Sequence, residues 1–210
     1  MQPTTAKLST AERLALAGAA LLVLLQAAAP WHELLQYQQG LSAQQPWRVF
    51  TAHLVHINWS HALINAAAWF VVARLFAPEL TGWRQPLVLA ASAVAITLSL
   101  ALLHPGIAWY RGFSGVLHAI FFAGASCYLL ATLRTGKRSF RALWLPAILL
   151  LGGAIKVALE QPVGSMTPYA EWLGAGTVPQ AHLAGAVTGA ALGVVFALGP
   201  APADTAAAVS

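Results

Sequence analysis

The chain has few charged residues. Of its 210 residues, only 8% are Asp, Glu, Lys or Arg, whereas 59% are hydrophobic. Soluble domains carry about 25% charged residues, so this composition excludes an ordinary water-soluble domain. Several apolar runs approach the roughly 20 residues that cross a bilayer as a helix. They are too long and too continuous for the alternating strands of a membrane barrel, so we expect an all-α membrane protein in contact with the lipid bilayer.

Cysteine is almost absent, because Cys127 is the single one. This excludes an intrachain disulfide and a cysteine-rich metal site. No H-E-x-x-H zinc motif occurs either. The net charge is +5, but no basic patch with interleaved aromatics accompanies it, so no nucleic-acid partner is expected. We therefore predict no metal, no cofactor and no nucleic acid.

Six apolar segments predict membrane-spanning helices, separated by prolines and glycines: residues 14–29, 51–75, 86–103, 114–133, 142–159 and 180–198. Lys and Arg gather before the first segment, between the second and third, and between the fourth and fifth, whereas only Arg48 and Arg111 lie in the other connections. The positive-inside rule then places both termini in the cytoplasm. We expect one domain and divide the chain into three parts: a cytoplasmic segment 1–13, the six-helix domain 14–198 and a cytoplasmic tail 199–210.

The first apolar segment has a second interpretation. Lys7 and Arg13, followed by an apolar stretch and the sequence AAAP, are also typical of a cleavable secretory signal. A retained helix is favoured because six segments form a consistent bundle. Cleavage would leave the orientation of the later segments unchanged.

Polar residues inside the expected spans are the strongest functional signal, because they are costly in lipid. The second, fourth and sixth segments run from outside to inside, so His61, Ser114 and His182 lie at a similar depth near the outer surface. Histidine is the usual base for a serine nucleophile. His61 and Asn65 are four residues apart and share a helix face, from which they can hold an oxyanion together with the Ser114 N–H. No Asp or Glu lies at that depth in these three segments, so we expect a Ser–His dyad without an acid.

Glycines support this arrangement. Gly112 and Gly115 flank the serine and allow a tight turn and a close backbone approach. A second set, spaced four apart, predicts that the sixth segment packs closely against the fourth: Gly185, Gly189 and Gly193.

Each candidate also has a structural interpretation. Ser114 can bond the carbonyl four residues earlier, His182 can be a satisfied bundle residue, and Asn65 can join two helices. Four polar residues at one depth, namely these three and His61, favour chemistry instead. A metal site is the main rival, because His56 lies close to His61 in sequence, but five residues separate them by about 140° on a helix.

Together these residues resemble the rhomboid intramembrane serine proteases. The sequence GFSG at 112–115 fits the family's G-x-S-G turn, AHLAG at 181–185 its A-H-x-x-G motif, and HINWSHALIN at 56–65 its H-x-x-x-x-H-x-x-x-N run. WR at 47–48 matches the W-R pair of the first outer loop. The resemblance implies a six-helix rhomboid-like bundle that cleaves membrane-anchored proteins, with Ser114 as nucleophile, His182 as general base, and the oxyanion held by His61, Asn65 and Ser114.

More narrowly, SGVLH at 114–118 and KVALE at 156–160 resemble the rhombosortase branch. That resemblance implies substrates with a C-terminal Gly-Gly tail, a single spanning helix and a basic end. The orientation from Lys and Arg turns the active site outward, so we expect a bacterial inner membrane with the active site open to the periplasm. The alternatives are a general rhomboid protease with other single-span substrates, a non-catalytic rhomboid-like binder of membrane segments, or a small transporter. Non-catalytic relatives lose the serine or the histidine, and both are present here.

Other residues are candidates for pocket or support. Rhomboids often carry a tyrosine four residues after the serine, where it packs on the catalytic histidine, but this chain has His118. His118 either contacts His182 and shapes the pocket or packs within the bundle. Lys156 and Glu160, four apart on one helix face, can neutralise each other. They either border the path of a substrate or form a structural ion pair; His56 is a further candidate for support.

Overall fold

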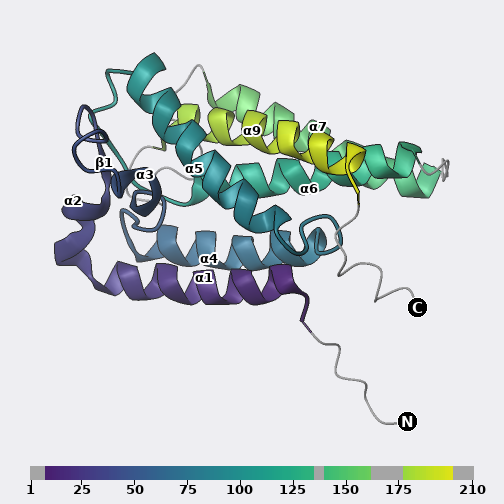
Figure 1. The fold of residues 1–210 in the computed structure, drawn as a ribbon, viewed down its shortest axis with the longest axis horizontal. Helices are drawn as coiled ribbons and strands as arrows, with labels where there is room; N and C mark the ends of the chain where they lie inside the picture. The colour runs from purple at the N-terminus through teal and green to yellow at the C-terminus, as the bar shows by residue number, and fades with distance from the viewer. Residues whose placement is uncertain (1–7, 135–139, 162–176, 201–210) are drawn as a thin grey trace, which may run out of the picture.

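The structure is a computed structural model that describes residues 8–134, 140–161 and 177–200. Long helices dominate it and lie side by side (Figure 1): α1 (Thr10–Ala27), α4 (Trp59–Leu75), α5 (Arg84–Leu103), α6 (Ser114–Arg134), α7 (Phe140–Glu160) and α9 (Pro179–Leu198). Short elements form the connection from α1 to α4 and the segment before α6: η1 (Ala29–Trp31), α2 (His32–Leu35), β1 (Tyr37–Gln38), α3 (Arg48–Thr51) and β2 (Trp109–Tyr110). The mostly helical architecture agrees with the prediction.

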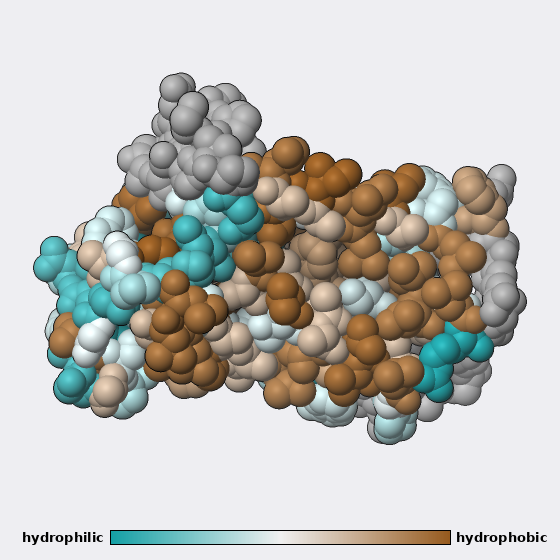
Figure 2. Space-filling model, turned by 90° about the horizontal axis from the view of Figure 1, so that it is seen from above, coloured by the Kyte–Doolittle hydropathy of each residue, from teal (hydrophilic) through white to brown (hydrophobic). Residues whose placement is uncertain are grey.

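Five described helices are long and apolar enough to cross a membrane: α1, α5, α6, the Leu143–Glu160 part of α7, and α9. Helix α4, which corresponds to the second expected span, has 17 residues. A broad apolar surface covers the middle of the bundle, whereas hydrophilic residues gather at the end where α2, β1 and α3 lie (Figures 1 and 2). These features are those of a multi-pass membrane protein.

The second long helix begins later than predicted. The expected segment was 51–75, but α4 starts at Trp59. Asn58 has an extended backbone and its side chain accepts a hydrogen bond of 2.9 Å from the His61 N–H, so it caps the helix. His56 therefore lies before α4, and the helical angle expected to separate it from His61 does not apply. Their ring centroids are 5.0 Å apart.

Helices α6 and α9 make the closest helix contact. A Cβ atom built on Gly185 would lie 2.0 Å from the carbonyl oxygen of Gly115, and one on Gly189 would lie 2.2 Å from that of Ala119. Only glycine fits at these positions, because any side chain would collide with backbone. The predicted close packing of small residues is thus confirmed. It brings the first turns of the two helices together.

Helix α1 packs on α4. Its N-terminus has a capping box, in which Ser9 and Glu12 bond each other's backbone N–H. The Glu12 carboxylate also forms an ion pair of 2.6 Å with Arg74 of α4. Near mid-helix, a Cβ on Gly18 would lie 2.0 Å from the Trp69 ring, so the two helices are in contact there as well.

A buried arginine and a pair of short strands hold the connection between α1 and α4. Arg48 is buried and donates to the carbonyl oxygens of Glu33, at 2.8 Å, and of Gln36. Strands β1 and β2 pair antiparallel, with Tyr37 opposite Tyr110. Strands this short were not predicted from the sequence. They tie the connection to the segment that leads into α6.

Helix α7 lies at the edge of the bundle. Of its membrane-spanning part, 17% is buried, compared with 56% for α6. The apolar core lies instead among α1, α4, α5, α6 and α9, with fully buried side chains such as Leu22, Phe76, Ile96 and Ile120. The last turn of α7 carries a buried polar group, Glu160, which reaches His182 of α9.

Candidate active site

Ser114 begins α6 directly after a glycine turn. Gly112 has φ +138°, a conformation that favours glycine, and a Cβ there would lie 2.8 Å from Cε1 of His61. The Gly112 N–H donates to the carbonyl of Ala52 at 3.0 Å, and the Tyr110 hydroxyl donates to the Gly112 carbonyl at 2.6 Å. These contacts hold the turn in place and leave the serine at the start of the helix.

The serine meets a histidine of α9. The distance between Oγ of Ser114 and Nε2 of His182 is 2.8 Å, and His182 is buried. Gly115 permits this contact, because a Cβ on it would lie 2.9 Å from the carbonyl oxygen of Ala181. The structure therefore brings together the two residues that the sequence proposed as nucleophile and base. A hydroxyl in this contact can pass its proton to the imidazole.

An acidic residue lies on the other side of the histidine. Oε2 of Glu160 is 2.8 Å from Nδ1 of His182, and Oε1 accepts a hydrogen bond of 2.7 Å from the Lys156 ammonium. The expectation of a Ser–His dyad with no acid at this depth is thus wrong for the geometry. It considered only the three segments that run inward, whereas α7 runs in the opposite direction and its last turn meets the first turns of α6 and α9. The Lys156–Glu160 spacing was the available signal.

His118 also belongs to this cluster. Its ring stacks on that of His182, with centroids 4.4 Å apart and planes inclined by 18°. His118 Nδ1 is 2.7 Å from the Ser114 carbonyl oxygen, and Nε2 is 3.0 Å from the Lys156 ammonium. Of the two interpretations left open by the sequence, contact with His182 is the one that the structure has.

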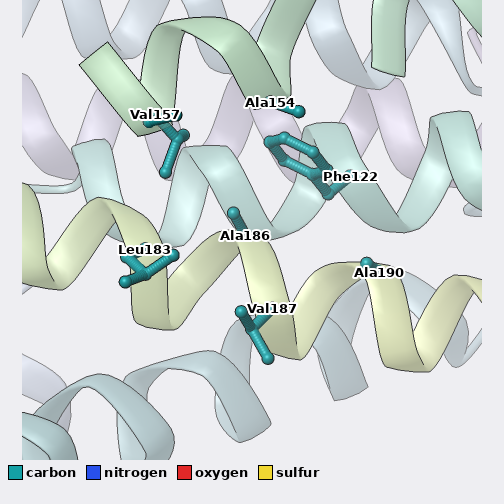
Figure 3. A pocket seen from close by; sticks show the side chains of 8 residues that line it. Phe122, Ala154, Val157, Leu183, Ala186, Val187 and Ala190 are labelled. Carbon is teal, nitrogen blue, oxygen red and sulfur yellow. The ribbon is translucent and has the colours of Figure 1, made fainter. Parts of the chain in front are cut away.

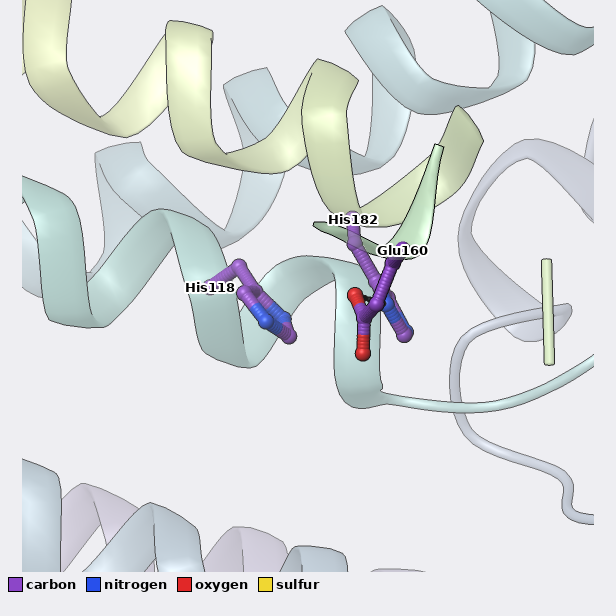
Figure 4. Close-up of side chains that lie close together, drawn as sticks. All are labelled: His118, Glu160 and His182. Atoms are coloured by element: carbon purple, nitrogen blue, oxygen red, sulfur yellow. Dashed lines mark hydrogen bonds and ion pairs between the residues drawn. The ribbon is translucent and has the colours of Figure 1, made fainter. Parts of the chain in front are cut away.

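Three side chains in this cluster are also potential metal ligands. Figure 4 shows His118, Glu160 and His182 converging from α6, α7 and α9, and one ligand atom of each lies within 4.8 Å of the others. Lys156, however, places its ammonium in hydrogen-bond contact with two of them. A positive charge at that position disfavours a second cation.

The other flank of the serine turn is formed by the start of α4 and the residues before it. His56 Nε2 accepts a hydrogen bond of 3.3 Å from the Phe113 N–H, so His56 supports the turn. His61 lies against Gly112, and Asn65 is buried one turn further along α4. Nδ1 of His61 and Nδ2 of Asn65 have no hydrogen-bond partner among the described residues. Buried polar atoms without partners are rare, so these two are free to bind a group that enters the site.

Replacing Asn65 by alanine separates oxyanion binding from helix packing. If the Asn65 amide binds the oxyanion, Asn65→Ala should lower kcat by about 10²-fold, with KM nearly unchanged. Thermal stability should hold or rise slightly, because a buried polar group without a partner is removed. Steady-state cleavage and thermal unfolding in the same detergent measure both. A residue that merely joins two helices would instead lose stability and keep kcat.

Burial also changes the acid–base behaviour of two histidines that lie before α4. Burial lowers the pKa of His53 to about 4 and that of His56 to about 3. Nε2 of His53 is 3.3 Å from the Ala93 carbonyl oxygen, and its ring packs edge-on against Tyr110. Both histidines are therefore neutral at pH 7, which leaves His56 able to accept the Phe113 N–H.

The lowered pKa of His53 predicts a loss of stability in acid. Below pH 6.5 the unfolded chain binds a proton at His53 that the folded chain does not bind until about pH 4. This contribution to stability is complete above pH 6.5 and declines as the pH falls from 6.5 to about 4. At pH 5 the loss of unfolding free energy amounts to about 2 kcal/mol. Unfolding of the parent and of His53→Gln, at pH 7 and pH 5, should show a smaller loss for the variant; equal losses would contradict the assignment.

Two apolar grooves run along α7, and they differ in what they reach. The first, of about 240 Å³, lies between α4, α6 and α7 and is lined by Val72, Leu117, His118, Phe121, Phe122, Gly153 and Lys156. The second, of about 250 Å³, lies between α6, α7 and α9 (Figure 3). Its lining residues are all apolar. Only the first groove therefore borders the polar cluster around His182.

A comparison with known protein families identifies the family of this chain. The Rhomboid domain family matches residues 43–198, a range that contains every site residue described above and more than half of the chain. Among curated proteins, none matches the sequence. The chain therefore belongs to the rhomboid family of intramembrane serine proteases, which act on membrane proteins within the bilayer.

Proposed function

We propose that this chain is a catalytically active rhomboid protease in which Ser114 is the nucleophile and His182 the general base. The observation that carries the proposal is the contact of 2.8 Å between Oγ of Ser114 and Nε2 of His182, made by two helices whose glycines let them touch. Rhomboid-like binders without activity need no such contact, so it favours an enzyme.

The reaction follows the usual course of acyl transfer. Oγ of Ser114 attacks the carbonyl carbon of the scissile peptide bond while its proton passes to Nε2 of His182. The oxyanion is held by the Ser114 N–H, at the positive end of α6, and by His61 and Asn65. The proton on His182 then goes to the leaving amine as the C–N bond breaks. Water hydrolyses the acyl-enzyme by the same steps, with the proton returning to Ser114.

The membrane arrangement is part of the proposal. We place six spans within residues 14–198, with α4 as the second and α1 retained, and both ends of the chain in the cytoplasm. In support, the start of α1 and the end of α9 lie at the same end of the bundle (Figure 1), and Lys and Arg favour that side. The serine then faces the opposite side, the periplasm of a bacterial inner membrane.

A substrate segment would reach the serine along the groove between α4 and α7. That groove is apolar along α6, as a spanning helix requires, and ends at His118 and Lys156, beside His182. Apart from its last turn, which the contact of Glu160 with His182 holds, α7 is little buried, so the rest of it can move with small loss of packing. The segment must unwind to present its carbonyl, which favours small residues such as glycine at the bond.

The substrate class we propose is that of the rhombosortases: exported proteins with a C-terminal Gly-Gly tail, one spanning helix and a basic end. This rests on SGVLH at 114–118 and KVALE at 156–160. His118, Lys156 and Glu160, which belong to these two stretches, all lie in the cluster around His182. A general rhomboid protease with other single-span substrates is the alternative.

Coexpression tests the proposal. The parent and Ser114→Ala are each produced with two tagged single-span reporters that differ only in whether a Gly-Gly tail precedes the span. We expect the parent to cleave the Gly-Gly reporter and the variant to cleave neither. Cleavage of the other reporter alone would support a general rhomboid protease. Equal cleavage by Ser114→Ala would contradict the proposal.

A further inference from the structure

We infer that Glu160 is a positioning residue of the active site, which fixes the tautomer and orientation of His182, and that Lys156 and His118 hold it in place. The inference rests on the proposed function, because it concerns the base of that reaction. It extends the pair of Ser114 and His182 to three residues joined by hydrogen bonds.

The direction of the hydrogen bonds follows from Lys156. An ammonium group can only donate, so Glu160 Oε1, at 2.7 Å, and His118 Nε2, at 3.0 Å, are both acceptors. A neutral His118 whose Nε2 accepts must carry its proton on Nδ1. That proton is donated to the Ser114 carbonyl oxygen at 2.7 Å.

The same reasoning fixes the state of the base. Glu160, ionised beside Lys156, can only accept hydrogen bonds, so His182 must carry its proton on Nδ1, 2.8 Å from Glu160 Oε2. Nε2 of His182 is then unprotonated. It accepts the hydroxyl proton of Ser114 at 2.8 Å, which is the state that a general base requires.

These contacts close a ring that begins and ends at the serine. It runs from the Ser114 hydroxyl through His182, Glu160, Lys156 and His118 to the Ser114 carbonyl. The stacked rings of the two histidines brace it across the middle, with centroids 4.4 Å apart. Every member comes from α6, α7 or α9, so the ring also locks the last turn of α7 to the first turns of the other two helices.

Glu160 also matters once the proton has moved. When Oγ attacks, His182 becomes an imidazolium, and its new charge lies against the carboxylate. Glu160 stays ionised throughout, and the proton on Nε2 goes to the leaving amine. A fixed negative charge in a water-poor site stabilises this state without reorganisation.

A purely structural ion pair between Lys156 and Glu160 does not explain all the contacts of the carboxylate. A pair between Lys156 and Glu160 needs a single carboxylate oxygen, yet the second oxygen bonds His182. The Glu160 side chain is 4% exposed, whereas that of Lys156 is 40% exposed. The carboxylate is thus turned inward to the histidine, while the lysine lies at the rim and supplies the balancing charge.

The test compares Glu160→Gln with a matched control, Glu12→Gln, in the full chain in detergent. Both changes turn a buried, paired carboxylate into an amide, but Glu12 bonds Arg74 on α4, away from the serine turn. We expect Glu160→Gln to lower kcat by about 10²- to 10⁴-fold, with KM unchanged. Glu12→Gln should keep kcat and lose only stability. Lys156→Met should cost less than Glu160→Gln, because the carboxylate still contacts His182.

Two further measurements separate positioning from folding. The double variant Lys156→Met with Glu160→Gln removes both charges, so it leaves no buried charge unpaired; it should fold as the parent and still lose kcat. The ¹⁵N resonances of labelled His182 should report the proton on Nδ1 in the parent and a changed ring state in Glu160→Gln. A side chain that only stabilised the fold would leave these resonances alone.

The outcomes are distinguishable. Full kcat in Glu160→Gln, with Ser114→Ala inactive, would overturn the inference and leave the proposed function standing. A parent without Ser114-dependent activity would overturn both. Activity that a chelator abolishes and Zn²⁺ restores would assign His118, Glu160 and His182 to a metal and overturn the positioning role.

Discussion

Replacing His182 by alanine should lower kcat/KM for the cleaved substrate by about 10⁴- to 10⁶-fold. The reason is that the Ser114 hydroxyl, 2.8 Å from Nε2 of His182, loses the group that takes its proton and later returns it to the leaving amine. Because the two residues act as one unit, the double variant Ser114→Ala with His182→Ala should be no slower than either single variant. Rates with a purified fluorogenic substrate in detergent measure all three.

A histidine outside the site supplies the control for this series. His104 follows α5 at its C-terminal end and takes no part in the contacts of Ser114. His104→Ala should retain the parent rate within about twofold. If the losses for Ser114→Ala and His182→Ala instead multiply in the double variant, the two residues act independently. That result would contradict the claim that Ser114 and His182 act together as nucleophile and base.

Replacing Gly185 by alanine should have the largest effect on the fold. The added methyl group would lie 2.0 Å from the Gly115 carbonyl oxygen. Neither backbone can yield without separating α6 from α9, so we expect a loss of about 3 kcal/mol or more in unfolding free energy. Activity should fall with it, because the same contact holds Ser114 against His182.

Gly152→Ala is the matched control, since it makes the same change in α7. A Cβ at Gly152 has no described atom within 4 Å. In a helix interior that change should be neutral or gain about 0.5 kcal/mol. Thermal unfolding of both variants in one detergent compares their stabilities. Equal stability of Gly185→Ala and Gly152→Ala would show that the close approach of α6 and α9 does not hold the fold.

Much of the site could be predicted because membrane insertion constrains depth. The charges in the connections predict the orientation of the helices, and that orientation predicts Ser114 and His182 at the same level. The glycine spacing then identifies the pair of helices that touch, which the structure confirms at Gly185. Apolar runs likewise located the ends of α5, α6 and α9 to within a few residues.

The parts that could not be predicted depend on contacts distant in sequence. Glu160 lies 22 positions before His182, on a helix of opposite direction, and nothing local to either residue reports their contact. The start of α4 was placed too early because the residues around His53 are apolar, whereas the helix begins after the Asn58 cap. The pairing of Tyr37 with Tyr110 joins strands of two residues each, which are too short for a sequence pattern.

The most direct test of the central claim is covalent labelling with a fluorophosphonate, followed by mapping of the modified residue by mass spectrometry. This reagent reacts with a serine only where a base activates it. We expect a single label on Ser114 in the parent, strong loss of labelling in His182→Ala, and none in Ser114→Ala. A label on any other residue, or labelling that persists in Ser114→Ala, would contradict it.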